Sequence, residues 1–184
     1  LYMKSPNSIY YSSVGSSSIT ISSVIDNGLY SFYAYDKAQN KSKTYYVYFD
    51  STKPVGTLKT SIGAVSSGSY TNQSFSYTAS DSGSGIKTLQ YKTPGSSTWK
   101  TYTSGTTISS TSTNGWYYFR AQDKSGLYSD ESKICLDTGK PTGTLYGGTK
   151  AAASGSTVTS QYVKFTATDG LSGISKVYVK KPGA

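Results

Sequence analysis

The sequence predicts an all-β protein built from tandem antiparallel β-sandwiches, and three observations support this fold class. First, the 184-residue chain repeats itself: residues 50–58 return 87 positions later at 137–145, and residues 78–81 return 88 positions later at 166–169. A period this long corresponds to a whole small domain. Second, 19 Tyr and many Thr, Val and Ile residues suit pleated, half-buried surfaces and are atypical of disorder. Third, no segment has a 3.6-residue apolar period, so helix is not expected.

The central copy of the repeat is expected to contain seven short strands separated by turns. Residues 55–59 follow Pro54, and residues 75–79 alternate large apolar with small polar side chains. Residues 86–92 follow an Asp- and Gly-rich turn, with Ile86, Leu89 and Tyr91 as candidates for burial. The remaining four are expected at residues 99–102, 106–109, 116–123 and 132–136. Asn114-Gly115 is a tight-turn dipeptide before the sixth strand.

Four motifs mark the chain, and two of them recur at matching positions of the copies. An Asp-x-x-x-Pro-x-Gly linker stands at 50–56 and 137–143, and an Ala-x-Asp-x-x-Ser-Gly-Ile turn at 79–86 and 167–174. A Tyr-Lys-x-Pro-Gly…Trp hairpin occupies 91–99, and a Gly-x-Tyr-x-Phe-x-Ala-x-Asp-x-Ala-x-Asn segment occupies 28–40. In these motifs the chain resembles the Ig-like repeats of large surface proteins of Gram-positive bacteria. The second copy departs from the pattern at residues 125–127, where Ala-x-Asn would be usual.

The resemblance implies an Ig-like sandwich on the bacterial cell surface or cell wall, and it also implies a domain frame. In that frame residues 53–139 form a complete repeat, 1–52 the back half of a preceding one and 140–184 the front half of a following one. A shifted frame, with modules at 1–88 and 89–176, is the alternative. Half a sandwich cannot bury its own face, so we also expect self-association through the half-domains or through edge strands.

Composition argues against several functions. The formal net charge is +9, but the Lys residues are scattered, whereas nucleic-acid binding concentrates them on one face. No apolar run approaches the roughly 18 residues of a membrane span. The chain has no His and no visible pair of opposed carboxylates, so we expect no enzyme activity. Cys135 is the one cysteine, which excludes an internal disulfide.

The aspartates of the linkers and turns allow two interpretations. In an Ig-like fold Asp50, Asp81 and Asp123 would gather between adjacent domains, and Asp137 and Asp169 would gather at the next boundary, where calcium could bind. Alternatively, each Asp caps its own turn. We favour capping, and therefore no cofactor, because each loop carries a single acid.

Aromatic residues are more numerous than one small core requires. They occupy both faces of their strands, which is consistent either with a cross-strand ladder or with an exposed binding surface. The candidate binding residues are Tyr45, Tyr46, Tyr48, Trp99, Trp116, Tyr117 and Tyr118. We therefore expect a non-catalytic, adhesin-type module whose partner is a host protein, such as an immunoglobulin, or a glycan. The alternatives are a passive stalk and a polysaccharide-binding accessory domain of a secreted enzyme.

Overall fold

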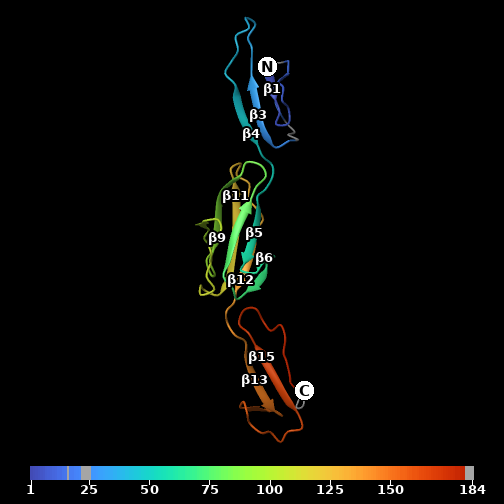
Figure 1. Cartoon of the computed structure of the whole chain (residues 1–184), viewed down its shortest axis with the longest axis vertical. Helices are drawn as coiled ribbons and strands as arrows, with labels where there is room; N and C mark the ends of the chain where they lie inside the picture. Colours follow the sequence, from blue (N-terminus) through green and yellow to red (C-terminus); the bar gives the residue numbers. More distant parts are fainter. Residues whose placement is uncertain (16, 22–25, 181–184) are drawn as a thin grey trace.

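The protein is all-β in the part of the chain that the structure describes. The computed structural model describes residues 1–15, 17–21 and 26–180, and these form fifteen strands and no helix. The all-β expectation is confirmed, and the sheets are mainly antiparallel and compatible with a β-sandwich. Within these residues no helix has the length and apolarity that crossing a bilayer requires. Three parts follow one another along the long axis of the molecule (Figure 1).

The N-terminal part is one four-stranded sheet. Its strand order is β2-β1-β3-β4, and every pairing is antiparallel. The strands are β1 (Tyr2–Lys4), β2 (Ser12–Ser13), β3 (Gly28–Tyr33) and β4 (Tyr45–Phe49). The exposed side chains of β4 alternate between the two faces of the strand, so both faces of this sheet are only partly covered at β4.

The central part contains two sheets. The three-stranded sheet has the order β6-β5-β8 and consists of β5 (Val55–Thr60), β6 (Gly63–Val65) and β8 (Phe75–Ser80). The five-stranded sheet has the order β10-β9-β11-β12-β7 and consists of β7 (Ser69–Thr71), β9 (Ile86–Lys92), β10 (Lys100–Tyr102), β11 (Gly115–Asp123) and β12 (Ser132–Leu136). All its pairings are antiparallel except that of β7 with β12, which is parallel.

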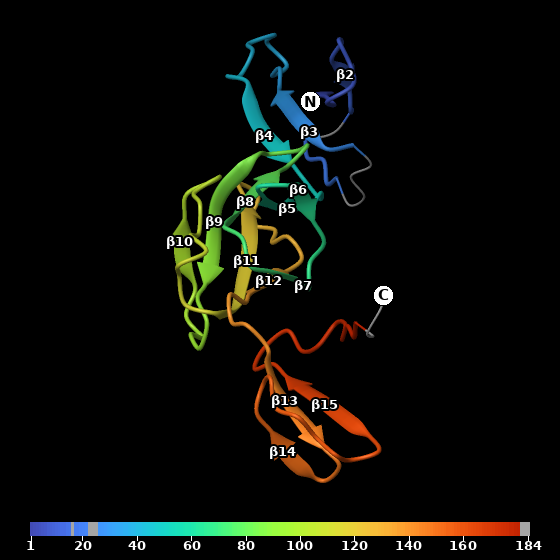
Figure 2. The ribbon, with the colours of Figure 1, turned by 60° about the horizontal axis from the view of Figure 1, so that its bottom comes forward.

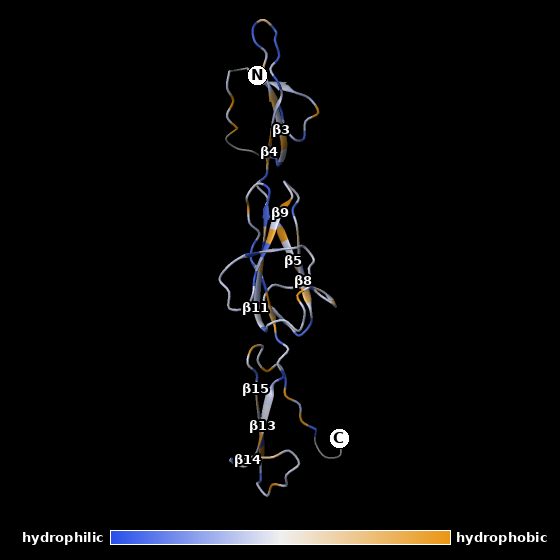
Figure 3. Ribbon diagram, turned by 90° about the vertical axis from the view of Figure 1, so that its left-hand side faces the viewer, coloured by the Kyte–Doolittle hydropathy of each residue, from blue (hydrophilic) through white to orange (hydrophobic). Residues whose placement is uncertain are grey.

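A single core lies between these two sheets. β11 alternates buried and half-buried residues along its whole length, which is the pattern of a strand with one face inward. Phe119 on this strand is fully buried and stacks on Tyr77 of the opposite sheet, with ring centroids 5.0 Å apart. The ten buried residues of the core are Leu58, Phe75, Tyr77, Leu89, Tyr102, Tyr117, Phe119, Ala121, Ile134 and Leu136. Figure 3 shows hydrophobic residues, in orange, on strands such as β5, β8 and β9.

Six of the seven strands expected in the central part are present, with ends that differ by at most one residue. The exception is residues 106–109, where only an isolated bridge joins Ile108 to Phe75. The expectation of a strand there was wrong, and β6 and β7 were not predicted. Both have only three residues, too few for an alternating pattern to stand out.

The C-terminal part is a separate three-stranded sheet, which Figure 2 shows apart from the central sheets. Its order is β14-β13-β15, with antiparallel pairings, and it consists of β13 (Thr142–Gly147), β14 (Lys150–Ala152) and β15 (Val163–Thr168). Phe165 of β15 is half exposed, and the following described residues, 169–180, form no strand. This sheet therefore contributes no buried cluster of its own among the described residues.

Candidate functional site

The candidate site lies where the chain passes from β4 to β5, at residues 50–54, which we call the first junction. Asp50 is the first residue of this linker and is only 8% exposed. Its Oδ2 accepts a hydrogen bond of 2.6 Å from the N–H of Ser84, in the loop between β8 and β9, and its Oδ1 accepts one of 2.9 Å from the N–H of Thr52. Hydrogen bonding by Ser84 is the largest influence on the pKa of Asp50 and holds it below its ordinary value.

Two further contacts fix the same loop against β4. The hydroxyl of Tyr48 donates to the carbonyl oxygen of Gly83 at 3.0 Å. Gly83 also lies against the carboxylate of Asp50, because a Cβ added at this glycine would stand 2.2 Å from Asp50 Oδ1. The first junction is therefore a packed contact between the N-terminal and central parts, and glycine at position 83 is what permits the close approach.

Asp81 begins the loop that Asp50 contacts. Its Oδ1 accepts hydrogen bonds from the N–H groups of Gly83, at 3.0 Å, and of Gly85, at 2.8 Å. This is the turn-capping role expected from the sequence. Its Oδ2, however, is buried and has no hydrogen-bond partner. Capping of the turn therefore explains the role of Oδ1 but not that of Oδ2.

Asp123 is the last residue of β11 and is fully buried. The alternation of this strand turns Asp123 to the same side as Phe119 and Ala121, which face the core. Its Oδ1 accepts hydrogen bonds of 2.8 Å from the N–H of Leu127 and from the hydroxyl of Ser125. Its Oδ2 is buried without a partner, as in Asp81.

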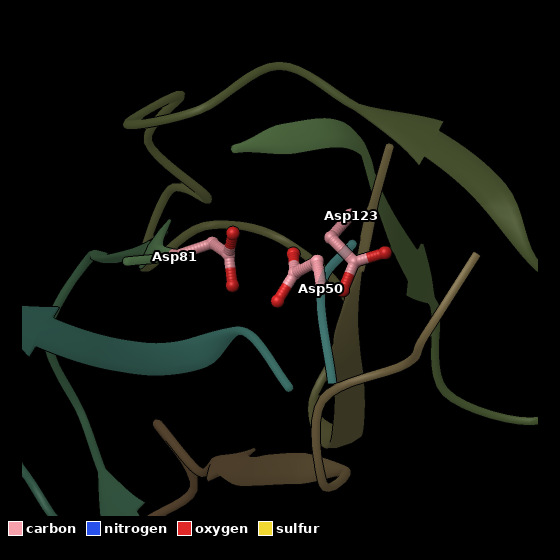
Figure 4. Close-up of side chains that lie close together, drawn as sticks. All are labelled: Asp50, Asp81 and Asp123. Carbon is pink, nitrogen blue, oxygen red and sulfur yellow. The ribbon is translucent and has the colours of Figure 1, made fainter. Parts of the chain in front are cut away.

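These three carboxylates converge on one point. One oxygen of each of Asp50, Asp81 and Asp123 lies within 4.8 Å of the others. Figure 4 shows the carboxylate of Asp81 facing that of Asp50, with Asp123 close on the other side of Asp50. The ion pairs found among the described residues, Lys53–Asp130 and Lys92–Glu131, involve none of the three. The site thus gathers negative charge, drawn from three separate segments of the chain, without a neutralising side chain within 4.0 Å.

The residue 87 positions before Asp123 shows how such a carboxylate can be satisfied locally. Asp36 accepts a hydrogen bond of 2.8 Å at Oδ1 from the N–H of Asn40, and another of 2.8 Å at Oδ2 from the side-chain amide of Asn40. Leu127 occupies the position of Asn40 in the later copy and keeps only the backbone bond. The leucine therefore leaves Oδ2 of Asp123 without the donor that its counterpart has.

The passage from β12 to β13, at residues 137–141, is the second junction, and it repeats part of the arrangement. The N–H of Ser172 donates to Oδ2 of Asp137 at 2.9 Å, and the N–H of Gly139 donates to Oδ1 at 3.0 Å. Asp169 caps its own turn, accepting at Oδ1 from the N–H groups of Leu171 and Gly173, each at 3.0 Å, and these bonds lower its pKa. Of the five aspartates predicted from the sequence, only Asp50, Asp81 and Asp123 form a three-carboxylate cluster within the described ranges.

The predicted aromatic residues fall into three groups. Tyr45, Tyr46 and Tyr48 are exposed on β4. Tyr117 is 3% exposed and belongs to the core, so it cannot contact a partner in the folded protein. Trp99, Trp116 and Tyr118 are half buried on or near the outer face of the five-stranded sheet.

On that outer face, the side chains of Arg120 and Lys92 make cation–π contacts with the aromatic rings. The Arg120 guanidinium lies 4.3 Å from the ring centroids of both Trp99 and Tyr128. The ammonium of Lys92 lies 4.4 Å from the Trp99 ring and 4.7 Å from the Tyr118 ring. This row consists of Trp99, Arg120, Tyr128, Lys92 and Tyr118, and we call it the cation–aromatic row. Trp99 and Tyr118 of this row were predicted from the sequence, whereas Tyr128 was not. The cations between the rings could be found only once β9 and β11 were paired.

The exposure of the side chains on β4 does not by itself indicate a binding surface. Val47 is exposed, whereas Ile134, 87 positions later, is fully buried in the central core. Val47 thus stands at a core-type position, and its exposure reflects an uncovered sheet face. A comparison with protein-family models, with curated proteins and with solved structures found no match for this chain.

Proposed function

We propose that the chain is part of a non-catalytic, extracellular stalk of a bacterial surface protein, in which Ig-like domains are joined end to end. The observation that carries the proposal is the hydrogen bond from Ser84 to Asp50 across the first junction, with its counterpart from Ser172 to Asp137 across the second. Both bonds join a linker residue to the loop after the second long strand of the next part. A flexible linker between independent binding modules needs no such contact.

The elongated arrangement supports this function. The three parts lie in series, and β5 and β11 run along the long axis (Figure 1). Pro54 is buried at the first junction, which restricts the backbone of the linker further. A spacer needs a fixed length and direction, and packed junctions supply both.

Small-angle X-ray scattering of the whole chain tests the proposal. The unaltered chain should scatter as a rod, and Asp50→Ala should make it visibly flexible, because it removes the acceptor of Ser84 and Thr52 at the first junction. Asp130→Ala is the control: its ion pair with Lys53 also lies near the junction, but it is exposed and worth little. Flexible scattering from the unaltered chain, unchanged by Asp50→Ala, would refute the stalk.

Recognition of a host protein or glycan is a second candidate function, and the cation–aromatic row favours it. Tyr and Trp side chains are over-represented in the energetic centres of protein interfaces, and rings also stack on sugars. Tyr128 is 39% exposed at the edge of the row, so part of it is open to a partner.

Pull-down from host serum and a glycan array test this second function. We expect Tyr128→Ser to abolish binding of any captured partner, while Tyr46→Ser, at an exposed position of β4, should leave the partner bound. If the unaltered chain binds nothing in either assay, recognition of a host molecule is refuted and the stalk function remains.

A further inference from the structure

We propose that Asp50, Asp81 and Asp123 bind a calcium ion at the first junction. The proposal concerns the metal alone, and it holds whether the chain acts as a stalk or as a binding module. It rests on three observations: two unpartnered buried oxygens, the spacing of the carboxylates, and the substitution of leucine for asparagine at position 127.

The unpartnered oxygens are the first observation. Asp123 is fully buried, and its Oδ2 has no hydrogen-bond donor. Oδ2 of Asp81 is buried and unpartnered in the same way. Buried charged groups are generally paired, hydrogen-bonded or bound to metals. Two orphaned carboxylate oxygens in one cluster, with no cation within 4.0 Å among the described side chains, therefore point to a cation as their partner.

The spacing is the second observation. Calcium binds oxygens at about 2.3–2.6 Å, so two ligands on opposite sides of the ion are separated by about twice that distance. The three carboxylate oxygens all lie within 4.8 Å of one another, which is within this span. Calcium accepts six to eight oxygens in flexible geometry, and carboxylates, carbonyl groups and water can supply the remainder. Magnesium demands near-ideal octahedral geometry and usually keeps several waters on only one or two carboxylates, so three carboxylates from separate segments suit calcium better.

Leucine at position 127 is the third observation. At Asp36 the side chain of Asn40 occupies the carboxylate oxygen that is free in Asp123. Leu127 replaces this donor with an aliphatic side chain while the backbone bond to Oδ1 is kept. The backbone bond of the turn is thus kept, and only the side-chain donor that would occupy Oδ2 is lost.

Binding would connect the linker to the central part from three directions. Asp50 belongs to the linker, Asp81 to the loop after β8, and Asp123 to the end of β11. One ion shared by all three holds the linker against the central part. Because the ion binds the folded state, it should raise the midpoint of thermal unfolding as its concentration rises. Extracellular calcium modules typically have dissociation constants of about 0.1–1 mM.

The test is isothermal titration calorimetry with calcium chloride, combined with thermal unfolding in calcium and in a chelator, on the whole chain. We expect one saturable site and a higher unfolding temperature in calcium. Asp123→Asn and Asp81→Asn should each weaken binding at least tenfold. Each keeps its hydrogen-bonded Oδ1 and turns the orphaned oxygen into an amide donor. In the chelator these variants should therefore be at least as stable as the unaltered chain, which a merely structural aspartate would not allow.

Two more variants sharpen the result. Asp169→Asn is the matched control: Asp169 is the counterpart of Asp81 at the second junction but belongs to no three-carboxylate cluster, so calcium binding should not change. Leu127→Asn recreates the Asp36–Asn40 pair beside Asp123 and should weaken calcium binding several-fold without unfolding the protein.

The proposal fails if calcium up to about 10 mM, well above the usual range of extracellular sites, produces neither saturable heat nor a shift in unfolding temperature. It also fails if Asp81→Asn and Asp123→Asn bind as the unaltered chain does, or if magnesium binds as tightly as calcium. Should Asp123→Asn not fold, Asp81→Asn and Leu127→Asn decide the question.

Discussion

The N–H of Ser84 donates to Oδ2 of Asp50 at 2.6 Å, although the two residues are 34 positions apart and belong to different parts of the molecule. The donor in this bond is the backbone amide of Ser84, and the acceptor is the side-chain carboxylate of Asp50. Ser172 and Asp137 make the same contact at the second junction, at 2.9 Å. Both junctions therefore share a contact between a linker aspartate and the backbone amide of a serine in the following loop.

Gly83→Ala should disrupt the first junction. The new Cβ would stand 2.2 Å from Asp50 Oδ1, which forces either the loop or the carboxylate to move. Gly83 has no positive φ, so the effect is one of space and not of backbone strain. Scattering should show a more flexible chain. Gly170→Ala is the control, because nothing lies within 4 Å of its Cβ position; equal flexibility in both variants would contradict the packing argument.

Acid should loosen the first junction. The pKa of Asp50 is lowered in the folded protein, so the ionised carboxylate stabilises the junction at any pH above the ordinary value of 3.8. That contribution is lost as the pH falls below 3.8 and through the lowered pKa. The protection of the Ser84 amide from hydrogen exchange, measured against the intrinsic exchange rate at each pH, should therefore fall only below about pH 4. In Asp50→Asn the same amide should show no such acid transition, and a transition that persists in this variant would assign it to another group.

Cys135 should be unreactive in the native protein. The thiol is fully buried, and burial raises its pKa above the ordinary value, so little nucleophilic thiolate exists at neutral pH. A thiol reagent should label it only after denaturant is added, and oxidation of the folded chain should give no disulfide-linked dimer. Rapid labelling without denaturant would mean that β12 opens readily.

Phe119→Ala should destabilise the central part by about 3–5 kcal/mol, as is usual for removal of a buried phenylalanine. Phe119 is fully buried and lies against the rings of Phe75, Tyr77, Tyr91 and Tyr102. Chemical denaturation measures the loss. Tyr70→Ala, which removes a half-exposed ring of the same sheet, should cost much less, and an equal loss would contradict the placement of the core.

The main strands could be predicted because their burial is periodic. β11 alternates over nine residues, and the alternation of residues 75–79 likewise identified β8. β7 could not be predicted from its own sequence, because Ser69-Tyr70-Thr71 is defined by its parallel pairing with β12, more than 60 positions later. Ile108, by contrast, lies in a segment with strand-like composition that makes only one bridge, to Phe75.

The residues of the candidate site could be predicted from the sequence, but the hydrogen bonding of their carboxylates could not. The repeat and the expected fold brought Asp50, Asp81 and Asp123 together, and the turn chemistry of Asp81 was foreseen. What the sequence could not show is that the same carboxylate caps a turn with one oxygen and leaves the other unpartnered. That division depends on side-chain orientation, which spacing along the chain does not specify.

The parallel pairing of β7 with β12 has a mechanical consequence. The chain enters the central part through β5 and leaves it through β12, whose pairing with β11 aligns it with the long axis. Tension along that axis pulls β12 lengthwise past Ser69, Tyr70 and Thr71. Bonds loaded in this shearing direction share the force and must break together, whereas a hairpin pulled apart from one end opens one bond at a time. A three-residue strand can in this way act as a clamp against stretching.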